Sequence, residues 1–134
     1  ETRGSVQLSG LGLPQDLALD ASARRLYVAH ALSPKYGALS VIDVSTLEIV
    51  ATLWGTADVP LLGSDAVRLD ATGPAVYLGL TTGCLVLDPA SLAIRQNIVV
   101  DGGVMSAWAS DALDGTLYLA GAQGELWTWR AAAP

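Results

Sequence analysis

Three stretches of this chain follow one pattern, and that repeat limits the possible folds more than any other feature. The stretches are "DASARRLYVAH" from Asp20, "DATGPAVYLGL" from Asp70 and "DALDGTLYLAG" from Asp111. Each aspartate is followed at the same spacing by a tyrosine, namely Tyr27, Tyr77 and Tyr118. The tyrosines lie 50 and 41 residues apart, and a period of this length indicates an array or a propeller of small β units.

A second phrase repeats between the tyrosines. "VIDVSTLEIV" from Val41 matches "VLDPASLAIR" from Val86, and a glycine precedes the strand in each copy, at Gly37 and Gly83. The third copy has Gly124 at the corresponding place. The second phrase occurs in the first two copies and its glycine in all three, which indicates that the repeated unit extends beyond the tyrosine motif.

One unit contains four short segments rich in β-forming residues, separated by polar turns. In the first unit these segments are residues 17–20, 25–30, 38–44 and 47–54. No segment shows a helical period over ten residues. We therefore expect an all-β fold of four-stranded antiparallel units.

The repeats indicate that residues 1–134 form a single unit of three blades. We expect a stray rim strand within residues 1–10, then blades at residues 11–55, 56–100 and 101–134. The third blade lacks its fourth strand, while "SVQLSGLGLP" near the N-terminus compares with the end of the first unit. The strands expected therefore number about twelve, which is three complete blades of four.

Composition and charge exclude several classes of protein. The chain is 51% hydrophobic and 15% charged, whereas about a quarter charged is typical, so we expect a partner to cover the apolar excess. No apolar run is long enough for a membrane-spanning helix. The net charge is −6 with scattered bases, which argues against nucleic acid. Cys84 is the only cysteine, so neither a disulfide nor a zinc cluster is expected, and it is interpreted as a buried thiol.

The repeated phrases resemble the YVTN family of β-propeller repeats, and more loosely NHL and lactonase-like propellers. The resemblance is carried by "LALDASARRLYVAH" with "GALSVIDVSTLEIVATL" and by the two later copies. Tyr27 and Val28 stand where the family motif begins, but Ala29 and His30 depart from it. The resemblance implies blades packed face to face, with first strands lining a channel and the tyrosines buried between blades. It implies little about function, and it alone favours an extracytoplasmic location.

The repeated aspartates are interpreted as turn caps. Asp20, Asp70 and Asp111 each end an expected first strand, where a carboxylate can accept hydrogen bonds from backbone N–H groups of the turn. A ring of carboxylates around calcium is the alternative. It requires several oxygens converging on one point, and one aspartate per blade would be too widely spread.

Five residues are candidates for a ligand-binding site, on the face where the family topology gathers loops. They are Asp16, His30, Lys35, Tyr36 and Asp65. Three of them come from the long loop "HALSPKYG", which carries the only histidine and the only lysine; the alternative is a solvated insertion. Trp127 and Trp129 could form an aromatic platform, although such pairs more often pack in a core or interface.

No catalytic residue and no metal site is predicted. One histidine cannot pair with a second as metal ligands, and no serine lies in a nucleophile elbow. No cofactor is expected. The leading hypothesis is a non-catalytic propeller module for binding or assembly that closes a six-bladed ring as a homodimer, or with another propeller segment. The alternative is a lactonase-like or quinoprotein-like enzyme whose site a second chain completes.

Overall fold

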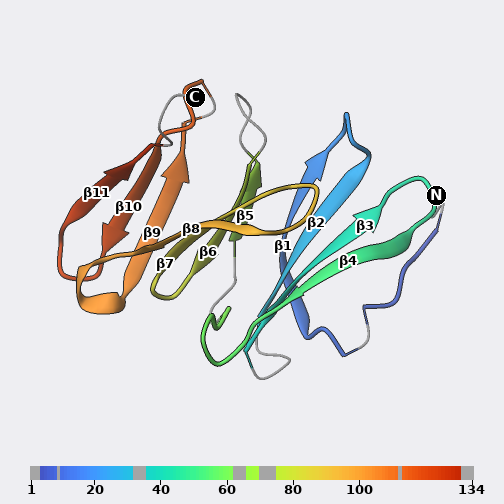
Figure 1. The fold of residues 1–134 in the computed structure, drawn as a ribbon, viewed down its shortest axis with the longest axis horizontal. Helices are drawn as coiled ribbons and strands as arrows, with labels where there is room; N and C mark the ends of the chain where they lie inside the picture. Colours follow the sequence, from blue (N-terminus) through green and yellow to red (C-terminus); the bar gives the residue numbers. More distant parts are fainter. Residues whose placement is uncertain are drawn as a thin grey trace. The chain divides into compact units, whose positions relative to one another are not determined.

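The protein consists of antiparallel β-sheets. A computed structural model describes residues 4–8, 10–31, 36–61, 66–69, 75–111 and 113–130. Apart from one short 3-10 helix, all regular structure in these residues is β-strand, as the sequence predicted (Figure 1). The chain divides into two compact units, residues 1–67 and 68–134.

The first unit contains the first sheet, whose strands are consecutive in the chain. The sheet has the order β1–β2–β3–β4, and every neighbouring pair is antiparallel. The strands are β1 (Leu13–Asp20), β2 (Arg25–Ala31), β3 (Ala38–Asp43) and β4 (Glu48–Trp54). β1 begins four residues before the expected segment, with an irregular register between Pro14 and Asp16. This bulge lets a proline lie at the start of an edge strand.

The strand expected near the N-terminus is not formed by residues 4–8. This segment pairs with no sheet edge, and a strand cannot satisfy its backbone groups alone. The backbone of Leu11 donates instead to the Leu8 carbonyl oxygen, at 3.2 Å. Gly4 lies close to the Leu47 side chain, so the segment runs beside the turn between β3 and β4.

Two further sheets follow. The second sheet, in the order β5–β6–β7–β8, contains β5 (Ala66–Leu69), β6 (Val76–Leu80), β7 (Gly83–Leu87) and β8 (Ile94–Val99). After η1 (Asp101–Gly103) comes the third sheet, of β9 (Met105–Ser110), β10 (Leu117–Gly121) and β11 (Leu126–Trp129). β11 pairs only with β10 among the described residues, so the third sheet there has three strands, as the sequence predicted (Figure 1).

The three sheets share one register. The repeated tyrosine lies on the second strand of each sheet and pairs with the same position of the third strand, as Tyr27↔Val41, Tyr77↔Val86 and Tyr118↔Thr128. Because side chains alternate across a strand, the tyrosines mark the same face of each sheet. We call it the tyrosine face, and the opposite face, which carries Leu117 and Leu119 in the third sheet, the leucine face.

The tyrosines are not equally buried. Tyr27 and Tyr77 are 0% and 1% exposed, as predicted, but Tyr118 is 40% exposed. The expectation that all three are buried is therefore wrong for Tyr118. The second sheet has another sheet packed on its tyrosine face, whereas no described strand packs on that face of the third sheet.

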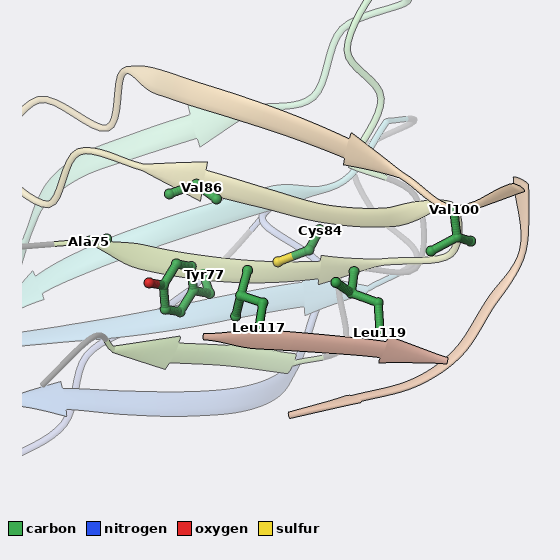
Figure 2. Packing of buried hydrophobic residues seen from close by; sticks show 7 residues of the cluster. All are labelled: Ala75, Tyr77, Cys84, Val86, Val100, Leu117 and Leu119. Atoms are coloured by element: carbon green, nitrogen blue, oxygen red, sulfur yellow. The ribbon is translucent and has the colours of Figure 1, made fainter. Parts of the chain in front are cut away.

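The packing between the second and third sheets forms the core of the second unit. Tyr77, Cys84 and Val86 from the tyrosine face of the second sheet pack with Leu117 and Leu119 of β10 (Figure 2). The partly buried Ile98, Met105, Trp108 and Trp129 pack against this cluster. The Tyr77 hydroxyl donates to the backbone carbonyl of Gly115, 3.5 Å away in the β9–β10 turn.

Aspartates cap the turns as predicted. Asp20 Oδ1 accepts from the Ala23 N–H at 3.1 Å, and Asp111 Oδ1 accepts from the Leu113 N–H at 2.7 Å. Asp43 and Asp88 cap the turns between third and fourth strands in the same way. Asp70 lies outside the described residues.

The fourth residue after each of these four aspartates has a left-handed backbone. The φ values are 55° at Arg24, 58° at Leu47, 59° at Leu92 and 73° at Gly115. Only the last position carries glycine, the residue that adopts this conformation without strain. The four turns therefore share a left-handed residue at this position, whatever its side chain.

Candidate functional site

The structure does not gather the five predicted ligand-binding residues into one site. Lys35 and Asp65 lie outside the described residues. Asp16 pairs with Ala29 across β1 and β2, and His30 is the next residue of β2. Side chains of consecutive strand residues point to opposite faces, so Asp16 and His30 do not converge. Tyr36 contributes its carbonyl oxygen, which accepts from the Leu61 N–H at 2.6 Å.

His30 is part of the interior of the first unit. Its side chain is fully buried, and its Nε2 lies 2.7 Å from the hydroxyl oxygen of Ser40, which is also buried. Burial lowers the pKa of His30, and a hydrogen bond to the Gly12 backbone opposes that shift only in part. A buried, neutral imidazole supports packing and hydrogen bonding; it cannot meet a ligand at the surface.

Groups for metal or nucleophilic chemistry do not cluster in the part of the chain that the structure describes. No three metal-ligating side chains come together there. Cys84 is buried in the core of the second unit, and burial raises its pKa to about 12. The thiolate is therefore scarce near neutral pH, and the thiol behaves as an apolar side chain, as expected. Across these same residues, no helix has the length and apolarity needed to cross a bilayer.

The two tryptophans of β11 contribute to packing. Trp127 and Trp129 pair with Leu119 and Leu117, so both belong to the leucine face of the third sheet. Trp129 is partly buried against the core cluster, while Trp127 is 40% exposed. The arrangement favours the packing interpretation over the aromatic platform.

The tyrosine face of the third sheet forms a shallow apolar hollow. Tyr118 and Ala120 of β10 form its floor, with Ala107 and Ala109 of β9 on one side and Leu126 of β11 on the other. Leu126 is 69% exposed and Tyr118 is 40% exposed. Three small side chains beside two large ones leave space for a bulky apolar group.

The leucine face of the first sheet is open along its first strand. Leu17 and Leu19 of β1 are 57% and 55% exposed. Leu17 pairs with Val28 and Leu19 with Leu26, so all four side chains share this face. Val28 is buried whereas the leucines of β1 are not, so exposure is concentrated on one strand.

The sequence predicted an apolar excess that a partner covers, but it did not indicate which residues form the two exposed faces. A signal was present: Leu17 and Leu19 flank Ala18, and Leu117 and Leu119 flank Tyr118. Both strands therefore follow a period of two with apolar residues on each side. Such a pattern predicts a strand covered on both faces, but it cannot show which face lacks its cover within the chain.

Comparison with known proteins assigns no family. No protein-family model matches the chain, and no curated protein is significantly similar to it.

Proposed function

We propose that this protein is a non-catalytic β-propeller module of the YVTN type whose role is assembly through its own sheet faces. In this proposal each sheet is a blade, and two copies associate around a two-fold axis to close a ring of six blades. Propellers have four to eight blades, so three blades need a complement. The ring is then a scaffold on which its loops can bind other molecules.

The observation that carries the proposal is the pair of exposed apolar faces. The tyrosine face of the third sheet exposes Tyr118 and Leu126, and the leucine face of the first sheet exposes Leu17 and Leu19. Exposed patches of this kind mark interaction sites. They belong to the first and last of the three sheets, which are the two that a ring would have to join.

Strand exchange is a second part of the proposal. β11 has a neighbour on only one side in the described structure, and residues 4–8 are not part of any sheet. A free strand edge is a template for pairing with another chain. In the proposed dimer, residues 5–9 of one copy add the missing fourth strand beside β11 of the other.

The enzymatic alternative has less support. A propeller enzyme needs ionisable groups that meet its substrate, whereas His30 is buried and Asp16 faces away from it. We therefore propose assembly, and not catalysis, as the function.

The mass of the protein in solution tests this proposal. Sedimentation equilibrium or multi-angle light scattering at micromolar concentration is expected to give the mass of two chains. A monodisperse single chain at these concentrations would contradict the proposal.

A further inference from the structure

We infer that Leu17 of one copy docks into the hollow on the third sheet of a second copy, above Ala120. This inference rests on the proposed self-assembly and specifies its seam. It follows from the contact between the second and third sheets, which supplies a template for how the tyrosine face of one sheet receives the leucine face of another.

The template has a small residue beneath a large one. A Cβ placed on Gly79, two residues after Tyr77 on β6, would lie 2.8 Å from Cε2 of Trp108 on β9. The indole therefore covers Gly79, where the tyrosine face of the second sheet has no side chain. This contact has a receiving half, the small residue on the tyrosine face, and an inserting half, the large side chain above it. The register that the three sheets share allows both halves to be located in the other sheets.

The receiving half is repeated on the third sheet. Ala120 follows Tyr118 by two residues on β10, just as Gly79 follows Tyr77 on β6. Ala120 is also on the floor of the apolar hollow, with Tyr118 beside it. The third sheet thus has a small residue at the receiving position and no described side chain above it.

The inserting half is repeated on the first sheet. Trp108 pairs with Leu119, the residue after Tyr118, and Leu17 pairs with Val28, the residue after Tyr27. Leu17 is therefore the first-sheet equivalent of Trp108, and it is 57% exposed. A leucine is smaller than an indole, and Ala120 is larger than Gly79, so the volumes change in opposite directions and partly compensate.

The hydrogen bond between the tyrosine of one sheet and the turn of the next can also form at the seam. The Tyr77 hydroxyl donates to the carbonyl of Gly115, the left-handed residue of the β9–β10 turn. The equivalent residue of the β1–β2 turn is Arg24, which has the same left-handed backbone. The Arg24 carbonyl already accepts from the Val44 N–H at 3.0 Å, and its second lone pair is the one that Tyr118 of another copy would use in the seam. A second copy therefore offers both an apolar group for the hollow and an acceptor for the tyrosine.

Two variants with one added cysteine each test the seam, because its two sides come from different surfaces. Leu17→Cys and Ala120→Cys chains are mixed and treated with a short bismaleimide, with each variant alone and the wild-type chain as controls. Cys84 is buried and serves as the internal background. A covalent dimer is expected only in the mixture. Cross-linking of either variant to itself would overturn the inference.

A charge substitution provides an independent measurement. Leu17→Asp is expected to weaken dimerisation about a hundredfold, because it removes one buried leucine at each of two seams. Leu113→Asp is the matched control, since Leu113 is 87% exposed and lies in the β9–β10 turn. A dimer unaffected by Leu17→Asp and not cross-linked in the mixture would overturn this seam but leave self-assembly standing. A single-chain mass for the wild type would overturn both.

Discussion

Gly79 lies beneath the indole of Trp108, and the lack of a side chain at this glycine determines how closely the second and third sheets approach. A Cβ there would come within 2.8 Å of Cε2 and 3.2 Å of Cζ2 of the indole. The backbone of Gly79 is not in the left-handed region, so the reason for glycine here is space.

Gly79→Ala is therefore expected to destabilise the protein by about 1–3 kcal/mol, the usual cost of overpacking a core. Urea unfolding measures the change. A double-mutant cycle with Trp108→Leu is the control, since a smaller side chain at position 108 should accept the added methyl group. Equal destabilisation by Gly79→Ala in both backgrounds would contradict the close contact.

Tyr77→Ala is expected to cost about 3–5 kcal/mol of unfolding free energy, because a large buried aromatic side chain leaves a cavity. Tyr77→Phe, which keeps the ring, should cost about 1 kcal/mol or less, since its hydroxyl makes a single long hydrogen bond of 3.5 Å. Both values come from chemical denaturation. Similar costs for the two substitutions would indicate that the hydroxyl, and not the ring, determines stability here.

Arg24→Gly is expected to stabilise the protein by about 1 kcal/mol, because arginine at Arg24 is held at a φ of 55°. The matched control is Gly115→Ala, which places a side chain at the equivalent left-handed position and should destabilise by a similar amount. Thermal unfolding of the two variants measures both changes. Loss of stability in Arg24→Gly would show that the arginine side chain contributes more than the strain removes.

Stability is expected to fall as the pH drops below about 6.5, the ordinary pKa of an unfolded histidine. Burial lowers the pKa of His30 in the folded protein, so the unfolded chain binds a proton more readily and protonation favours unfolding. His30→Gln removes this titration. The difference in unfolding free energy between pH 7.5 and pH 5 should be smaller in the variant than in the wild type.

Cys84 is expected to react slowly with iodoacetamide in the native protein, because it is buried and its pKa is raised to about 12. In urea the rate should rise to that of a free thiol. The rate in dilute urea then reports how often the second and third sheets separate. Rapid native alkylation would show that the core of the second unit opens readily.

The fold was predictable because the repeated phrases mark equivalent strands in each sheet. The spacing of aspartate and tyrosine placed Tyr27, Tyr77 and Tyr118 on equivalent strands, and the register confirms that placement. Asp20 and Asp111 cap turns as expected because the capping geometry is local. Burial was harder to predict, and Tyr118 is exposed because burial depends on which sheet lies opposite.

The candidate site was less predictable. His30 was predicted to bind a ligand as part of the long loop "HALSPKYG", but it lies on β2 with its side chain buried beside Ser40. Proximity in the sequence did not reveal that Asp16 and His30 lie on opposite faces, since this depends on the irregular register after Pro14. Ala120 could not be predicted as part of a contact site from the sequence, because its role follows only from the contact between Gly79 and Trp108.

The strand order of the sheets has a consequence for folding. Each strand pairs with its neighbours in the chain, so every sheet forms through short loop closures, and sheet formation should be fast. An undocked sheet leaves the apolar side chains of both its faces in water, so the later docking of one sheet on the next adds the stability that comes from burying them. In the second unit, β10 docks through Leu117 and Leu119. A nascent chain stopped before β9 would therefore form the second sheet only transiently. Tyr77 and Cys84 would then be exposed to water, and the chain would be prone to aggregate.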